Sequence, residues 1–526
     1  MWAHDEWWRD AVFYQIYPRS FAATNSPSGV GNLRGVISRL PYIADLGADA
    51  IWLSPIFVSP QKDHGYDVAD YYDIDPLFGT LADFDELVER AHELDVRVTV
   101  DLVPNHTSDQ HEWFQAAVAA GPGSPERSRY LFRDGRGPSG DEQPTDVVSS
   151  FSGPAWTRIT EPDGSPGQWY FHLFASEQPD LNWQNPEVLA EFERVWRFWL
   201  DRGVDGFRVD VADHLTKDIS RTDKAEGNQL LEHEPDARTH QVWRRFRQIL
   251  NEYIPDRTAV GEIWAVGDDQ ALYGRPDEFP LMFNFRFLKA GWDMPELRAA
   301  VDEALLRRGS AGATPVWVLD NHDMVRSATR LADDPQDGLA RSRALSLLML
   351  CLPGTVYLYQ GQELGLPNVD DLPDEVLQDP IWERSEHTDR GRDGCRVPLP
   401  WSTAGSSLGF ADDPLVDPWL PQPTTYAELA VEEQRQQPES TLQFFLALLR
   451  LRRESAALRH GSLAWLPTVP GVLHLERQQG DDRIEVVVNG STKPVALPSG
   501  TVLISSGEVL ADRVLPPNTA CCLVRD

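Results

Sequence analysis

The segments LRGVISRLPYIADLGADAIWL, residues 33–53, and LADFDELVERAHELDVRVTVDLV, residues 81–103, decide the fold of this chain. Each begins with apolar residues at three- and four-residue spacing, a pattern typical of a half-buried helix. Each ends in a short run of β-branched or aromatic residues, which is typical of a buried strand. This repetition of helix and strand predicts a parallel sheet whose strands are joined by helices.

The same alternation continues through most of the chain. Six more short apolar runs have the composition of strands: 11–16, 206–211, 259–263, 282–285, 316–319 and 356–359. Amphipathic stretches predict further helices at 186–201, 241–253, 295–308 and 339–352. Eight strands alternating with helices predict an α/β fold, a (β/α)8 TIM barrel.

Two regions interrupt this pattern. Residues 105–180 separate the third and fourth predicted strands and are rich in Gly, Pro, Ser and aromatic residues. Because a structureless loop of that length is rare, we expect an inserted domain over the barrel mouth, and residues 1–104 and 181–455 form the predicted barrel. Short alternating runs between turn residues predict a C-terminal antiparallel β domain, a β-sandwich, over residues 456–526.

The composition excludes some functions. The chain has 526 residues with 82 acidic against 48 basic ones, so nucleic acid and anionic membrane surfaces are unfavourable partners. We expect a small neutral substrate instead. The first ten residues include charged ones where a signal peptide would be apolar, no run of 18 apolar residues occurs, and the four cysteines lack disulfide or zinc spacing. A cytoplasmic protein, monomeric or a small homo-oligomer, is the expectation.

Polar residues follow several of the predicted strands, where the loops of such a barrel converge on an active site. The strand ends read DLVPNH at 101–106, GFRVD at 206–210, GEIW at 261–264 and DNHD at 320–323. Arg208 and Asp210 lie two apart on a strand, so their side chains face the same side. They form either a structural ion pair or a site in which Arg208 keeps Asp210 ionised.

Cleavage of an acetal needs two carboxyl groups. One attacks or stabilises the anomeric carbon, and the other protonates the departing oxygen. Asp210 and Glu262 follow adjacent predicted strands and suit this division. Adjacent strands can bring two carboxyl groups to the spacing of about 5 to 5.5 Å that a retaining double displacement requires.

These motifs, in this order, resemble an α-glucosidase of the α-amylase family, glycoside hydrolase family 13. The segments DLVPNH, GFRVDVADH, EIW and LDNHD are similar to the family's four strand-end motifs. QPDLNW at 178–183 and GRDGCRVPLPW at 391–401 resemble the branch of oligo-1,6-glucosidases and α-glucosidases. With WWRDAVFYQIYPRSF at 7–21, the likeness covers nearly the whole chain.

The resemblance implies catalytic roles for three carboxyl groups. Asp210 would be the nucleophile, Glu262 the acid/base, and Asp323 the residue that grips sugar hydroxyls and stabilises the transition state. Residues implied to line the same subsite are Arg208, His106 and His322.

The resemblance also implies a pocket that is closed at its far end. Asp67 and Arg396 match the pair that binds the terminal glucose there and makes the enzyme exo-acting. Tyr66 matches the platform under the glucose ring. The side of the pocket formed by the inserted domain would carry Phe151, Phe174 and Gln178.

The implied activity is release of terminal α-D-glucose from maltose and short malto-oligosaccharides, with a small α-glucoside as substrate and no cofactor. Many relatives carry an acidic loop after the first strand that binds Ca²⁺ or Mg²⁺. Residues 21–29 contain no carboxylate, and a hard cation requires several anionic oxygens. We therefore expect no metal at this loop.

Three other functions are compatible with the residues. Val211, directly after the predicted nucleophile, resembles enzymes that accept α-1,6 links, as in oligo-1,6-glucosidases. The covalent glucosyl intermediate could also pass to a second sugar, which would make the protein a transglycosylase or a sugar isomerase. A non-catalytic binding protein of the same fold is the remote alternative, but such proteins lack catalytic carboxylates and Asp210, Glu262 and Asp323 are present here.

Overall fold

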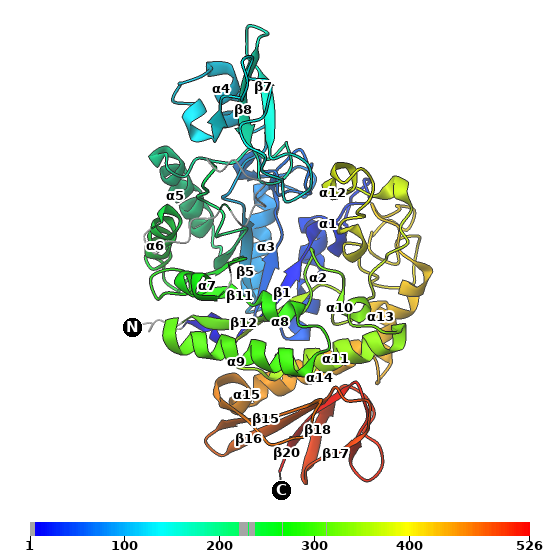
Figure 1. Cartoon of the computed structure of the whole chain (residues 1–526). Helices are drawn as coiled ribbons and strands as arrows, with labels where there is room; N and C mark the ends of the chain where they lie inside the picture. Colours follow the sequence, from blue (N-terminus) through cyan, green and yellow to red (C-terminus); the bar gives the residue numbers. More distant parts are fainter. Residues whose placement is uncertain (1–5, 220–229, 231–236, 266, 312, 526) are drawn as a thin grey trace.

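A closed barrel of parallel strands forms the centre of the computed structural model (Figure 1). The structure describes residues 6–219, 230, 237–265, 267–311 and 313–525. Within these residues the barrel strands are β1 Val12–Ile16, β2 Ala50–Leu53, β5 Arg97–Leu102, β9 Gly206–Val209, β10 Thr258–Gly261, β11 Leu281–Phe283, β12 Thr314–Val318 and β13 Thr355–Tyr359. Each pairs in parallel with the next along the chain, and β13 pairs with β1 to close the ring. The predicted TIM barrel is confirmed, and its strand ends differ by at most two residues from the prediction.

Long helices alternate with these strands and surround the barrel. They are α2 Leu33–Leu46, α3 Leu81–Glu93, α5 Pro186–Asp201, α6 Arg238–Leu250, α9 Met294–Ala311 and α11 Pro335–Cys351. Local sequence explains their ends. Helix α3 begins at a capping box, in which Thr80 and Asp83 each accept the other's backbone N–H, and α2 ends at Gly47, whose φ of 99° is left-handed.

The chain between β5 and α5 forms a separate unit that projects beyond the barrel mouth, at the top of Figure 1. It contains α4 Glu112–Ala120 and an antiparallel sheet of β6 Phe132–Arg133, β7 Trp156–Thr160 and β8 Pro166–Phe171. The buried Lys217 ammonium ties this unit to the barrel. It lies 2.7 Å from the Asp180 carboxylate and donates a 2.6 Å hydrogen bond to Asn105.

A second unit lies at the opposite end of the barrel, where α14 Thr441–Glu454 and α15 Ala456–His460 lead into antiparallel strands. One sheet contains β14 Ser462–Trp465, β15 Val472–Gln479, β16 Asp482–Asn489, β20 Thr519–Val524 and β18 Thr501–Ser505. A smaller sheet pairs β17 Val495–Ala496 with β19 Val514–Leu515. The C-terminal antiparallel β domain is thus confirmed. The domain limits after residues 104, 180 and 455 lie between elements and stay predictions.

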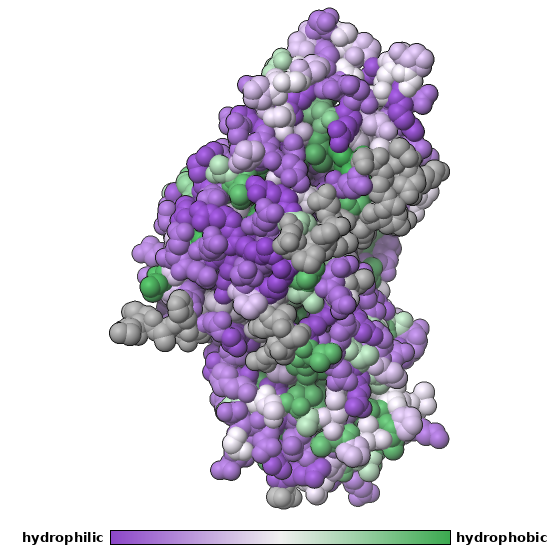
Figure 2. Space-filling model, turned by 60° about the vertical axis from the view of Figure 1, so that its left-hand side comes forward, coloured by the Kyte–Doolittle hydropathy of each residue, from purple (hydrophilic) through white to green (hydrophobic). Residues whose placement is uncertain are grey.

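Short elements lie in the segments between the longer ones. They are α1 Pro18–Phe21, β3 Phe57–Val58, β4 Asp70–Ile74, α7 Gly267–Tyr273, α8 Phe285–Lys289, α10 Ser327–Arg330, α12 Pro380–Arg384 and α13 Val431–Gln436. No helix in the described residues is long and apolar enough to cross a membrane. The face shown in Figure 2 is mostly hydrophilic, with apolar side chains in small separate areas.

The carboxylate of Asp205, directly before β9, joins three neighbouring segments and provides a test of the packing. It accepts hydrogen bonds from the backbone N–H of Val98 at 2.9 Å and from Arg257 at 2.6 Å, and it lies 2.7 Å from His92 Nε2. Because the Asp205 and Arg257 side chains are only 6% and 11% exposed, solvent cannot replace the lost partner.

We predict that Asp205→Asn lowers the free energy of unfolding by about 3 kcal/mol, the usual cost of breaking a buried ion pair. Urea denaturation measures this. The matched control is Asp333→Asn, which breaks the ion pair between Asp333 and Arg341. Because the Asp333 side chain is 80% exposed, this change should cost less than about 1 kcal/mol. Equal losses in the two variants would contradict the structural role of Asp205.

Candidate active site

A pocket of about 320 Å³ opens at the carboxyl ends of the barrel strands, between the barrel, the inserted unit and the loops after β13. Nine of the predicted site residues line it: Tyr66, His106, Phe151, Phe174, Gln178, Asp210, Glu262, His322 and Asp323. A larger cavity of about 670 Å³ lies beside α7, α8 and α9. That cavity includes none of these nine residues. The candidate site is therefore identified by its carboxyl groups and not by the size of its cavity.

The floor of the pocket is organised by one guanidinium, that of Arg208 on β9. Its Nη1 donates to Asp210 at 2.7 Å and to Asp101 at 2.9 Å, and its Nη2 donates to Glu262. The ring of Trp52 lies 5.1 Å from the same guanidinium. The side chain of Arg208 is only 3% exposed, so its geometry is fixed by these partners.

The floor concentrates negative charge where water is scarce. Burial raises the pKa of Asp210 well above its usual range, and the nearby Glu262 carboxylate adds to this increase while Arg208 opposes it. Burial likewise raises the pKa of Asp101 to about 7. Asp101 and Asp210 are therefore disposed to keep a proton near neutral pH. Carboxyl groups with raised pKa values of this kind are suited to acid/base catalysis.

The backbone after β9 and β10 is held in an unusual conformation. Val211 has a φ of 34°, a left-handed value that is strained for a β-branched residue, and its N–H donates to Glu262 Oε2 at 3.1 Å. The carboxylate of Asp213 accepts the N–H groups of Trp264 at 2.8 Å and Ala265 at 2.7 Å. The loop after β9 therefore fixes the loop that follows Glu262.

Tyr66 and His322 form the opposite side of the floor, and their rings stack with centroids 5.4 Å apart. Gln15 donates to His322 Nδ1 at 2.8 Å, so the proton of this imidazole lies on Nε2, 2.6 Å from the Tyr66 hydroxyl. The hydroxyl in turn donates to Asp101 at 3.0 Å. Burial lowers the pKa of His322 well below its usual range, so the ring stays neutral.

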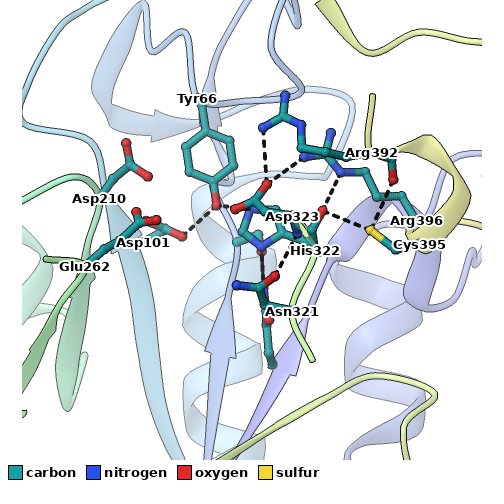
Figure 3. A network of polar contacts seen from close by, with 12 residues as sticks. Tyr66, Asp101, Asp210, Glu262, Asn321, His322, Asp323, Arg392, Cys395 and Arg396 are labelled. Atoms are coloured by element: carbon teal, nitrogen blue, oxygen red, sulfur yellow. Dashed lines mark hydrogen bonds and ion pairs between the residues drawn. The ribbon is translucent and has the colours of Figure 1, made fainter. Parts of the chain in front are cut away.

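Asp323 is the carboxylate on this side, and it faces two cations. Arg396 donates to its Oδ1 at 3.0 Å and Arg392 at 3.2 Å. Burial alone would raise the pKa of Asp323, but the positive charges of Arg392 and Arg396 more than offset this, so the pKa is well below its usual range. Figure 3 shows Asp210 and Glu262 on one side of Tyr66 and Asp323 with both arginines on the other.

The inserted unit supplies the remaining wall. Gln178 Nε2 lies 3.1 Å from His106 Nε2 and donates to Asp63 Oδ2 at 3.0 Å. The Phe174 ring lies 5.4 Å from that of His106 and 5.3 Å from that of Phe151. Burial lowers the pKa of His106 to about 4, so this histidine is also neutral near pH 7.

The structure does not bring Asp67 and Arg396 together, so the predicted pairing of these residues is corrected. Asp67 is fully buried away from the pocket, where it accepts hydrogen bonds from the Ser59 hydroxyl and from the N–H groups of Lys62 and Asp63. Arg396 lies behind Asp323 and donates to the His322 carbonyl at 2.8 Å. Arg208 likewise lies below the lining of the pocket.

The carboxylate and guanidinium that pair in the pocket are instead those of Asp63 and Arg392. Arg392 donates to Asp63 at 2.9 Å, and both residues line the pocket. The two candidate carboxylates are four residues apart, and their directions depend on left-handed turns at His64, φ 51°, and Gly65, φ 103°. Sequence spacing does not show such turns.

Other pocket residues were also missed: Ser150, His214, Trp264 and Ile381. Trp264 and His214 could have been predicted from the sequence, because both lie within the quoted strand-end motifs. Ser150 and Ile381 lie in irregular segments, where no sequence pattern indicates a site residue.

Comparison with known proteins identifies the family. Residues 15–461 match the α-amylase catalytic domain. The chain belongs to the α-amylase family of glycoside hydrolases, as its motifs predicted.

Relatives within this family match almost the entire chain. A probable α-glucosidase of Rhizobium meliloti is 38% identical, over 92% of this chain and 90% of the relative. An oligo-1,6-glucosidase of Parageobacillus thermoglucosidasius is 33% identical, over 93% and 91%. Among solved structures, the α-glucosyl transfer enzyme XgtA is 35% identical, covers 99% of both chains and superimposes with a TM-score of 0.85.

The position of Arg208 predicts a pH-dependent loss of stability on its removal. Arg208→Gln leaves three buried carboxyl groups without their cation, so the raised pKa values of Asp101 and Asp210 rise further above the unfolded value of about 4. Groups with a raised pKa in the folded state lose stability as pH rises. We expect Arg208→Gln to be about 3 to 5 kcal/mol less stable than the parent at pH 8, with a smaller difference at pH 5.

Urea unfolding at the two pH values measures this difference. Arg208→Lys keeps the positive charge and should recover part of the loss at pH 8. A difference between parent and Arg208→Gln that does not change with pH would show that packing, rather than charge, is the role of Arg208.

Proposed function

We propose that this enzyme is an exo-acting, retaining α-glucosidase that releases terminal α-D-glucose from maltose and short malto-oligosaccharides through a covalent glucosyl-enzyme intermediate. The observation that carries the proposal is that Asp210 and Glu262 bond to the same guanidinium at the floor of the pocket. The four buried free cysteines support a reducing, cytoplasmic setting.

The shared guanidinium supports retention of configuration. Asp210 and Glu262 accept from the two adjacent terminal nitrogens of Arg208, which favours the spacing of about 5 to 5.5 Å in retaining enzymes over the about 6.5 to 9.5 Å of inverting ones. In the proposed first step, Asp210 attacks the anomeric carbon as the bond to the leaving oxygen breaks. Glu262 gives its proton to that oxygen. In the second step the oxygen of a water molecule bonds to the anomeric carbon, the bond between that carbon and Asp210 breaks, and Glu262 accepts the proton that the water loses.

Within this proposal Glu262 carries the proton and Asp210 attacks as the carboxylate. The charge of Arg208 opposes the rise in the pKa of Asp210 that burial causes. Both N–H groups that bond to Glu262, from Arg208 and from Val211, donate to Oε2. Oε1 is therefore the better place for the proton that the leaving group receives.

The other pocket residues have the chemistry to hold a glucose ring. The carboxylate of Asp323 stays ionised and can accept hydrogen bonds from sugar hydroxyls, and the neutral rings of His322 and His106 line the same pocket. Tyr66 presents an aromatic face on the pocket floor. We propose that these four residues orient the ring so that its anomeric carbon faces Asp210.

The pair of Asp63 and Arg392 accounts for exo action in this proposal. The guanidinium of Arg392 bonds to Asp63, to Asp323 and to Asp379, and lies 5.1 Å from the Phe151 ring. This network closes the end of the pocket behind the terminal glucose. A chain extended beyond that glucose has no path there.

A second candidate function is supported by the relatives. Relatives of this chain are named oligo-1,6-glucosidase and α-glucosyl transfer enzyme. Val211 beside Glu262 is the residue that resembles enzymes for α-1,6 links. A change of apolar bulk at one residue shifts preference by about 1 to 3 kcal/mol, so we propose maltose first and isomaltose-type substrates second.

Incubation of the parent and Asp210→Asn with maltose, isomaltose, sucrose and trehalose tests the proposal. We expect the parent to release α-glucose, with maltose the best substrate. The variant should lose at least about 10³-fold in kcat, because the attacking carboxylate is absent. Polarimetry or NMR of the first product identifies the anomer.

Each alternative predicts a different product pattern in this experiment. Faster release from isomaltose would assign an oligo-1,6-glucosidase. Disaccharide isomers or trisaccharides without free glucose would assign a transferase or isomerase. β-Glucose as first product would refute retention, and no turnover of any sugar would support a binding protein.

Paired variants distinguish the two assignments of the far wall. Asp63→Asn removes the charged partner of Arg392 in the pocket, and we expect kcat/KM for maltose to fall about 10- to 100-fold, from a lost contribution of about 1.5 to 3 kcal/mol. Asp67→Asn is the matched control four residues away. It should lower the melting temperature while changing kcat/KM by less than about threefold. A large fall in kcat/KM for Asp67→Asn but not for Asp63→Asn would instead support Asp67 as the residue of the far wall.

A further inference from the structure

A second polar cavity, of about 580 Å³, lies at the end of the barrel opposite the active site. It is bordered by the residues that precede β1 and β2, by the first residue of β5, and by the last turns of α14 and α15. Because these are the amino ends of the strands, no residue of the catalytic pocket takes part in it. We call it the basal cavity.

The basal cavity reverses the charge balance of the chain. Five arginines line it: Arg9, Arg97, Arg452, Arg453 and Arg459. His460 adds a further titratable group, against the three carboxyl groups of Glu6, Asp10 and Asp49. The whole chain has 82 acidic residues against 48 basic ones, so a random part of its surface would be acidic. A concave site with an excess of arginine therefore needs an explanation.

Two of these arginines have carboxylate partners. Arg9 forms an ion pair with Glu6, and Arg459 lies 2.5 Å from Asp10. In the described part of the chain, Arg97, Arg452 and Arg453 have no carboxylate within 4.0 Å. Three guanidinium charges at the basal cavity are thus not neutralised by close ion pairs.

Arg452 is the most deeply buried of the three, because only 2% of it is exposed. Its guanidinium donates to four backbone carbonyls, including those of Leu350 and Gly354 at 2.6 Å, and its Nε has no partner within the described ranges. Burial lowers its pKa, and Asp10 and Asp49 compensate only in part. A buried cation that bonds only to neutral groups is costly unless an anion lies nearby.

Arg97 and Arg453 are positioned on either side of the cavity. The Arg97 guanidinium lies 4.5 Å from the Trp7 ring, which fixes its direction. Arg453 passes over Gly47, where a Cβ would lie 3.3 Å from its Nη2. Asp49, which also lines the cavity, accepts the Val12 N–H at 2.8 Å, and burial raises its pKa. Asp49 is therefore a weak counter-ion for these arginines.

We propose that the basal cavity binds a small polyanion of the phosphate class, either inorganic phosphate or the phosphate group of a sugar phosphate, through Arg97 and Arg453, with the buried charge of Arg452 adding to the attraction. Planar guanidinium groups match the oxygens of a tetrahedral anion with two parallel hydrogen bonds. The limited volume of the cavity and the net negative charge of the chain favour a small ligand over a nucleic acid or a membrane. The proposal does not depend on the glucosidase function.

Thermal unfolding of the full chain tests this site. Potassium phosphate should raise the melting temperature by roughly 3 °C or more relative to potassium chloride at equal ionic strength, because a ligand that binds only the folded state stabilises it. In Arg97→Gln/Arg453→Gln this increase should disappear, while kcat/KM for maltose stays that of the parent. Arg452 is left intact because its removal could prevent folding.

A matched control separates the site from general loss of charge. Arg202→Gln/Arg298→Gln removes two other arginines, near Asp85 and Asp302, and should keep the full phosphate effect. A phosphate effect no larger than that of chloride, or one that persists in Arg97→Gln/Arg453→Gln, would overturn the proposal.

A second arm identifies the source of the anion. Glucose 6-phosphate that acts at tenfold lower concentration than phosphate in the parent, but not in Arg97→Gln/Arg453→Gln, would assign a sugar phosphate. Equal potency would assign free phosphate. Glucose is the control for binding in the catalytic pocket. It should change the melting temperature of the parent and of the two double variants by the same amount.

Discussion

The buried guanidinium of Arg208 is the interaction on which the active site depends. Three carboxyl groups from three barrel strands could not share a dry floor without a cation among them, since like charges in a low dielectric repel strongly. Arg208 bonds to each of them and is itself held beside Trp52. The barrel makes this possible, because β5, β9 and β10 are adjacent and their carboxyl ends meet.

The rest of the fold keeps this floor dry and fixed. Asp213 holds the backbone after Glu262, and Lys217 bonds the end of the inserted unit to the barrel. The strained conformation of Val211 persists because both flanking strands are locked in the sheet. A site of this kind is a property of several loops on one rigid support rather than of any single motif.

The sequence predicted the parts of the structure that follow from periodicity. Alternating helix and strand patterns located all eight barrel strands, because buried parallel strands are short, apolar and bounded by amphipathic helices. The residues at strand ends were also predictable, because Asp210 and Glu262 continue straight from β9 and β10. Loop residues were not, since the direction of Asp63 or Asp67 depends on left-handed turns between them that have no periodic signature.

The charge around the pocket suits a cationic transition state. Six carboxyl groups gather near it, Asp63, Asp101, Asp210, Glu262, Asp323 and Asp379, against the three guanidinium groups of Arg208, Arg392 and Arg396. Even with a proton shared on the floor, the balance is negative. A neutral sugar gains little from this excess, whereas an oxocarbenium-like carbon is stabilised by it. The arrangement therefore favours the transition state over the bound substrate, which is the condition for lowering the barrier.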